Sequence, residues 1–230
     1  MKRKKLVIFL AIVLVLLAGG IWFWQNLSWL QSGSENQPQP LENIERNFTG
    51  EQQKIYKGRI VEAEEYLDSL NQNNPNYSNF EFNAFVYLAQ QYYGLGQMQK
   101  AKDYYDAALA KRPTDENVMV GLSLVYIQSG RLNEAGVLYS QALERNPKNA
   151  DIWLRYIEVR KSQGDSGQNL GYLFEDALKK TERHPDILTK AAQFQEQQGN
   201  PAKAIELWQE VSKVNPAGAD LYQNEINRLE

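Results

Sequence analysis

The feature that most constrains the fold of this chain is a self-similarity with a period of 34 residues. Five positions of one unit recur in the next with the same residue types: Gly96, Ala101, Tyr105, Ala108 and Pro113 return as Gly130, Ala135, Tyr139, Ala142 and Pro147. We name this set of recurring positions the repeat frame. A looser version of it spans residues 58–75 and 199–216, and a less regular unit with one extra residue includes residues 153–177. A fixed period of this length is typical of repeats that bury their apolar faces only against neighbouring units.

Each recurring position has a local physical reason, and together they predict two helices per unit. Glycines separate two stretches of apolar periodicity, where a turn needs a positive φ angle: Gly96, Gly130, Gly164 and Gly199. Small side chains stand where two helices must cross closely: Ala101, Ala135 and Ala204. Large side chains follow on the same helical face, where they can fill the space between pairs: Tyr105, Tyr139, Phe174 and Trp208. Prolines then stop the second helix: Pro113, Pro147 and Pro216.

On these positions the chain resembles the tetratricopeptide repeat family, whose unit of two antiparallel helices carries the pattern W-x2-L-G-x2-Y, then A-x3-F, then P. The resemblance covers residues 44–216, about five units, and implies an all-α fold: an α-solenoid of tetratricopeptide helix pairs. The first unit is degenerate, because Asn47, Gly50 and Lys54 stand where its first helix should be apolar. We expect residues 217–230 to form a capping helix over the apolar face of the last unit.

The beginning of the chain predicts a single N-terminal transmembrane helix ahead of the repeats. Residues 1–5 are basic, and an uncharged stretch at 6–24 would form a helix of roughly 28 Å, close to the thickness of the hydrocarbon layer. A cleaved signal peptide is the alternative, but the apolar run continues past the small residues at 18–20 into aromatic ones, which favours a signal anchor. Residues 25–43 are expected to be a juxtamembrane segment and flexible tether.

The basic residues at the N-terminus also predict the orientation of the chain. Positive charge is retained in the cytoplasm, so residues 1–5 should be cytoplasmic and the repeats should lie across the membrane. This is the topology of a single-pass inner (cytoplasmic) membrane protein with a periplasmic or extracellular repeat domain. The alternative is a cytosol-facing receptor with an N-terminal anchor, as in organelle import receptors.

The composition argues against several functional classes. Beyond residue 34 the chain carries 21 Lys and Arg against 28 Asp and Glu, which disfavours nucleic-acid binding because phosphate contacts need clustered cations. Cysteine is absent, so thiolate metal sites are excluded. His184 is the only histidine and precedes Pro185 at a junction between helices, where we interpret it as a loop residue. We therefore predict no enzyme activity, no cofactor and no metal.

The resemblance implies a binding module whose concave side is lined by the first helix of each pair. The partner-binding groove predicted on matching positions consists of Asn83, Val86, Gln90, Tyr93, Asn117, Val120, Leu124, Ile127, Asp151, Leu154, Arg155 and Glu158. Its apolar stripe would hold a peptide or helix of a protein partner. These residues could instead pack between adjacent units or against the tether of the chain itself.

The sequence thus predicts a membrane-tethered protein–protein interaction scaffold or assembly factor of an envelope protein complex. The alternative from another class is a structural organiser, in which the repeats self-associate into homo-oligomers at the membrane surface.

Overall fold

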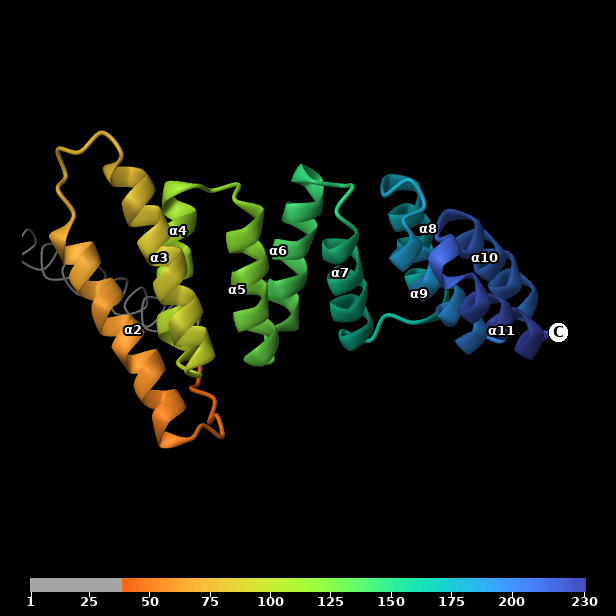
Figure 1. The fold of residues 1–230 in the computed structure, drawn as a ribbon, viewed down its shortest axis with the longest axis horizontal. Coiled ribbons are helices and arrows are strands. Elements are labelled where there is room, and N and C mark those ends of the chain that lie inside the picture. The colour runs from red at the N-terminus through yellow and green to blue at the C-terminus, as the bar shows by residue number, and fades with distance from the viewer. Residues whose placement is uncertain (1–38) are drawn as a thin grey trace, which may run out of the picture. The chain divides into compact units, whose positions relative to one another are not determined.

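A computed structural model of the chain describes residues 39–230. The repeats lie in one compact unit, residues 41–230. The predicted anchor at 6–24 and the basic segment at 1–5 lie outside the described residues. Within the described part of the chain, the structure contains ten α-helices, one short 3-10 helix and no strand (Figure 1). No helix in this part has the length and apolar character needed to span a membrane.

The helices follow one another along the unit in chain order (Figure 1). Their bounds are α2 Gly50–Ser69, α3 Tyr77–Gly94, α4 Met98–Lys111, α5 Glu116–Gln128, α6 Leu132–Arg145, α7 Ala150–Ser162, α8 Gly167–Lys180, α9 Pro185–Gln197, α10 Pro201–Val214, the 3-10 helix η2 Pro216–Gly218 and α11 Ala219–Leu229. The most extensive packing is within the pairs α3–α4, α5–α6 and α9–α10, and each of α4 and α6 also packs against the helix that follows. The prediction of an all-α solenoid of helix pairs is confirmed.

The turns and the core contain the residues that the repeat frame predicts. Positive φ angles of 83°, 72°, 100° and 74° occur at Gly96, Gly130, Gly164 and Gly199. The small crossing residues have no exposed surface, and the large ones are buried: Ala101, Ala135 and Ala204, with Tyr105, Tyr139, Phe174 and Trp208. Helices α4, α6 and α10 end two residues before Pro113, Pro147 and Pro216. A continuous stack of helix pairs therefore buries its apolar faces between units.

In the place expected for a degenerate first pair, the chain forms an extended segment and one long helix. Helix α2 begins after Thr49, whose hydroxyl accepts from the Gln52 backbone N–H while the Gln52 side chain accepts from the Thr49 backbone N–H. This reciprocal capping starts the helix at Gly50, inside the stretch that lacks apolar periodicity. Helix α2 buries Ile60 and Ala63 and packs against α3.

The extended segment before α2, which we name the strap (residues 41–48), is docked on the turn between α3 and α4. The Leu41 backbone N–H donates to Gln99 Oε1 at 2.8 Å, and the Ile44 backbone N–H donates to the Gly96 carbonyl oxygen at 2.8 Å. The Leu41 side chain is buried. A Cβ atom at Gly96 would lie 2.0 Å from the Ile44 carbonyl oxygen, so the strap approaches the turn as closely as a glycine permits.

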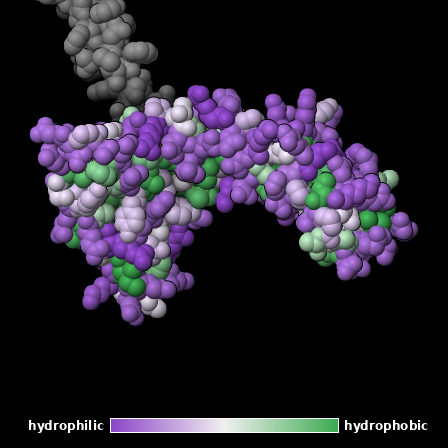
Figure 2. All heavy atoms as spheres, turned by 45° about the horizontal axis from the view of Figure 1, so that its top comes forward, coloured by the Kyte–Doolittle hydropathy of each residue, from purple (hydrophilic) through white to green (hydrophobic). Residues whose placement is uncertain are grey.

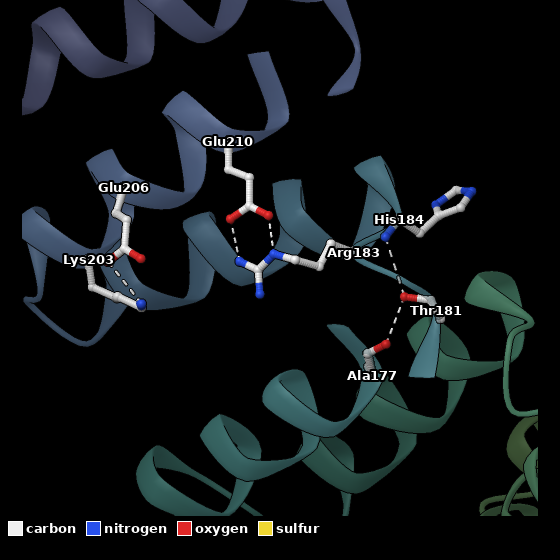
Figure 3. Close-up of polar contacts among 7 residues, drawn as sticks. All are labelled: Ala177, Thr181, Arg183, His184, Lys203, Glu206 and Glu210. Atoms are coloured by element: carbon white, nitrogen blue, oxygen red, sulfur yellow. Dashed lines mark hydrogen bonds and ion pairs between the residues drawn. The ribbon is translucent and has the colours of Figure 1, made fainter. Parts of the chain in front are cut away.

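The link between α8 and α9 departs from the repeat pattern. Glu182 and Arg183 adopt positive φ angles of 55° and 61°, although neither is a glycine. Figure 3 shows the contacts that hold this link: the Arg183 guanidinium faces the Glu210 carboxylate of α10, and Thr181 Oγ1 donates to the Ala177 carbonyl oxygen at 2.7 Å. Helix α8 packs less extensively on α7 and α9 than the members of the other pairs pack on each other. The irregular unit is therefore the loosest part of the stack.

Helix α11 covers the last pair. The Tyr222 ring stacks on the Trp208 ring with centroids 5.9 Å apart, and the Tyr222 hydroxyl accepts from Asn215 Nδ2 at 2.9 Å. Tyr222 and Ile226 are buried, whereas most of the opposite face is polar and exposed. Such an amphipathic helix shields the terminal apolar face of a repeat array from water.

Candidate partner-binding groove

The twelve predicted groove residues all lie on α3, α5 and α7, the first helices of their pairs. The apolar members and Tyr93 are half-buried: Val86, Tyr93, Val120, Leu124, Ile127 and Leu154. The polar members are exposed: Asn83, Gln90, Asn117, Asp151, Arg155 and Glu158. Figure 2 shows that the surface of the repeat unit is largely hydrophilic, interrupted by apolar patches, and hollowed between the two ends of the unit.

Five of the predicted residues come together around one pocket of about 380 Å³, which we name the α5–α7 pocket. They are Leu124, Ile127, Leu154, Arg155 and Glu158. The structure adds Tyr139 from α6, Phe174 from α8 and Lys190 from α9 to the same pocket. The lining is mainly apolar, with charged side chains from α7 and α9. A concave, mostly apolar site with a few polar groups is the usual form of a ligand-binding pocket.

The remaining predicted residues do not line this pocket: Asn83, Val86, Gln90, Tyr93, Asn117, Val120 and Asp151. Tyr93 contacts the strap, because the Arg46 guanidinium carbon lies 5.6 Å from the centroid of its ring. This is a cation–π contact with the segment of the chain that precedes the repeats. At Tyr93 the surface is therefore partly covered by the protein itself.

Tyr139 gives the pocket a buried polar group. Its side chain has no exposed surface, and the Arg155 side chain lies close to its hydroxyl. Burial raises the pKa of the Tyr139 hydroxyl, and the nearby positive charge of Arg155 partly opposes this rise. The hydroxyl therefore stays protonated at neutral pH.

Sequence reasoning assigned Tyr139 and Phe174 to packing between pairs and did not include Lys190. Both aromatic side chains do pack in the core, and they also form part of the pocket wall. Lys190 could have been found, because it follows Arg155 by 35 residues, which is one period plus the extra residue of the irregular unit. It is thus the equivalent of Arg155 on the next first helix.

In residues 39–230, no group of three or more His, Asp or Glu side chains is placed to hold a metal ion. His184 is the N-cap of α9, where its Nδ1 accepts from the Asp186 backbone N–H at 3.3 Å. The local chemistry of this histidine is that of a helix cap.

Comparison with known proteins agrees with this geometry. Residues 92–153 and 126–168 match the model of a tetratricopeptide repeat family. No curated protein matches the sequence.

Solved structures of other proteins share the fold, among them the following three. The crystal structure of MamA is 14% identical, with 77% of this chain and 99% of that chain covered and a TM-score of 0.55. BtubC (BKLC) from P. vanneervenii is 14% identical over 76% of this chain and 82% of its own, with a TM-score of 0.56. A tetratricopeptide repeat protein from Parabacteroides merdae is 18% identical over 78% and 70%, with a TM-score of 0.53. The repeat unit therefore has the tetratricopeptide repeat fold, and residues 92–168 match the model of that family.

Proposed function

We propose that this protein is an interaction scaffold that binds a polypeptide partner in the groove lined by α3, α5 and α7. The α5–α7 pocket carries the proposal. Leu124, Ile127 and Leu154 line it and are only half-buried, so a partner side chain could remove further apolar surface from water. Interfaces gain most of their binding energy where an apolar anchor enters a pocket of this kind.

We further propose that residues 6–24 hold the scaffold in the inner membrane. The support is the sequence: a basic segment at 1–5, an uncharged apolar stretch of spanning length, and aromatic residues at its far end. In this arrangement the repeats lie in the periplasm or outside the cell and recruit proteins of an envelope complex. Protease added to intact spheroplasts should then digest the repeats, whereas protection until the membrane is broken would contradict this topology.

The groove is tested by placing charge in the pocket. Leu124→Glu together with Ile127→Glu should abolish the capture of crosslinked partners in native membranes, identified by mass spectrometry. A buried or half-buried carboxylate without a partner opposes the docking of an apolar side chain. Circular dichroism and a thermal melt of each variant would show that the helices are retained.

Val61→Glu together with Val137→Glu is the matched control. These two valines are 52% and 57% exposed and do not line the α5–α7 pocket, so the same chemical change is made elsewhere. The control should capture partners like the wild type. Equal capture by the groove variant and the wild type would contradict the proposal.

A further inference from the structure

Helix α2 is a second helix that lacks a first helix beside it. The later second helices α4, α6, α8 and α10 each pack against the helix before them and the helix after them. Among the described helices, α2 packs extensively only against α3, because the strap stands where its first helix would be. Helix α2 therefore forms the end of the row of described helices (Figure 1), and much of its length is exposed.

Two large apolar side chains lie on the exposed side of α2. Ile55 and Tyr66 are 47% and 46% exposed. The other side of the helix carries Glu64, whose carboxylate accepts from the Tyr92 hydroxyl at 2.6 Å, and the Tyr92 ring stacks on the Tyr104 ring of α4. With 3.6 residues per turn, Ile55 and Tyr66 both lie roughly 160–180° around the helix from Glu64, so they face away from α4.

Helix α3 extends this apolar surface. Phe85 and Tyr92 face α4, because both rings contact the Tyr104 ring. Phe80 and Tyr87 are exposed, and they lie about 140° around α3 from Phe85 and Tyr92 respectively. The exposed apolar side chains of α2 and α3 are therefore all on the side of the pair that faces away from α4.

The exposed side of α2 has the spacing of a helix–helix interface. Its exposed residues recur at alternating steps of three and four, and we name them the α2 seam: Gln52, Ile55, Arg59, Glu62, Tyr66 and Ser69. This spacing keeps one stripe of a helix in contact with a second helix along its length. The exposed residues of the opposite flank are charged apart from Val61: Lys54, Lys57, Glu65 and Asp68.

The α2 seam is complementary to itself when two copies of the helix run in opposite directions. Arg59 and Glu62 are equally far from the midpoint between residues 60 and 61, and so are Ile55 and Tyr66. A twofold axis at this midpoint places Arg59 opposite Glu62 of the second copy and Ile55 opposite Tyr66, and each pairing occurs twice. In a parallel arrangement Arg59 would instead face Arg59, and Glu62 would face Glu62, which is repulsive.

We infer that the α2 seam is a homodimer interface, in which α2 packs antiparallel against α2 of a second copy of this chain. The second copy takes the side of α2 that a first helix covers in the later pairs, and Phe80 and Tyr87 border it. This interface shares no residue with the α5–α7 pocket, so the dimer would offer two such pockets. The inference goes beyond the proposed function and does not depend on it.

The register is tested by disulfide crosslinking of the full-length protein in detergent, because the chain has no cysteine of its own. Ile55→Cys and Tyr66→Cys copies, co-expressed with different tags and oxidised, should form a mixed disulfide dimer. Each variant alone should not, because equal positions in the antiparallel pair are offset by roughly 16 Å along the helix, beyond the reach of a disulfide. Co-expressed Lys57→Cys and Glu65→Cys copies carry the same test to the opposite flank and should not crosslink.

The charge pairing is tested by a swap, with sedimentation equilibrium of the full-length protein as the measurement. Arg59→Glu and Glu62→Arg, each alone, should raise the dissociation constant of the dimer at least tenfold, because like charges then meet across the axis. The double variant Arg59→Glu with Glu62→Arg should restore it. Lys57→Glu makes the same change of charge on the opposite flank and should leave the dimer unchanged. Thermal melts should be similar for all four, since these side chains are exposed.

Other results would overturn the inference. A monomeric wild type, a dimer that Arg59→Glu does not weaken, or a double variant that stays weak would each exclude this interface. A monomeric wild type that loses partner capture on Ile55→Glu with Tyr66→Glu would assign the α2 seam to a helix of another protein. The proposed function is judged separately, by partner capture in Leu124→Glu with Ile127→Glu.

Discussion

At the scale of single residues, one absent methyl group controls how closely α4 and α5 pack. Gly121 lies in α5, and a Cβ atom built on it would stand 2.5 Å from the ring and hydroxyl oxygen of Tyr105. The Tyr105 ring is itself buried, so it cannot swing away into water. Gly58 is the contrasting case, because it lies in α2 with nothing within 4 Å of its missing Cβ.

This contrast predicts opposite effects for the same substitution. Gly58→Ala should raise the free energy of unfolding by about 0.5–1 kcal/mol, since alanine loses less backbone entropy in a helix. Gly121→Ala should lower it by about 1–3 kcal/mol, because overpacking outweighs the helical gain. Urea denaturation followed by circular dichroism measures both changes. Stabilisation by Gly121→Ala would show that the Tyr105 ring can yield.

The turn glycines could be predicted from the sequence, whereas the need for glycine at position 121 could not. The turn glycines are confirmed because a positive φ angle is a property of one residue and its immediate neighbours. The need for glycine at position 121 depends on Tyr105, which belongs to the preceding helix. No pattern within α5 indicates this need.

At the scale of elements, the helix pairs could be predicted from the apolar periodicity of the sequence, whereas the strap could not. Residues 41–48 have no apolar period, and their docking depends on hydrogen bonds to Gly96 and Gln99, more than 50 residues away from the first residue of the strap. In the sequence, two features of the irregular unit indicated the loose packing of α8. The unit has one extra residue, and Glu182 stands two residues after α8, where α4, α6 and α10 are followed by a proline. Neither signal predicts that the resulting space would be an apolar pocket.

The strap can be tested with two equivalent turn glycines. Gly96→Ala and Gly130→Ala both place alanine at a positive φ angle, which costs about 1–2 kcal/mol in each case. Only at Gly96 would the new Cβ meet the strap, because nothing lies within 4 Å at Gly130. Gly96→Ala should therefore also accelerate hydrogen exchange at the Ile44 amide, while Gly130→Ala leaves that amide protected. Equal protection in both variants would argue against the docked strap.

At the scale of the whole molecule, the pocket arises from parts of five helices, and this limited its prediction. Five of its residues were predicted from the repeat frame, since positions on first helices share a side of the solenoid. The role of Tyr139 in the pocket was missed because a buried core residue and a pocket residue carry the same sequence pattern. Lys190 was missed because the groove was extended over only three first helices.

Burial of tyrosines in the core makes the stability of the whole unit sensitive to alkaline pH. Burial raises the pKa of Tyr105 to about 12. The folded state therefore holds this proton more tightly than the unfolded state, whose tyrosines ionise near pH 10. The associated stability is fully present below pH 10 and is lost as the pH rises towards 12, an effect of about 2–3 kcal/mol.

The far-ultraviolet circular dichroism of the wild type should accordingly report unfolding above pH 10, in step with tyrosinate absorbance. Tyr105→Phe cannot ionise and should move the alkaline midpoint upwards. Identical midpoints in the two proteins would show that Tyr105 does not contribute.

The docked strap also sets the mechanics of the chain. Tension on the polypeptide ahead of Leu41 would reach the Leu41–Gln99 and Ile44–Gly96 hydrogen bonds before it reached α2. The force would therefore act first at the turn between α3 and α4 and not on α2, so α2 would not unfold first. If the protein is pulled at its N-terminal end while it holds a partner, α2 should stay folded until these two hydrogen bonds break.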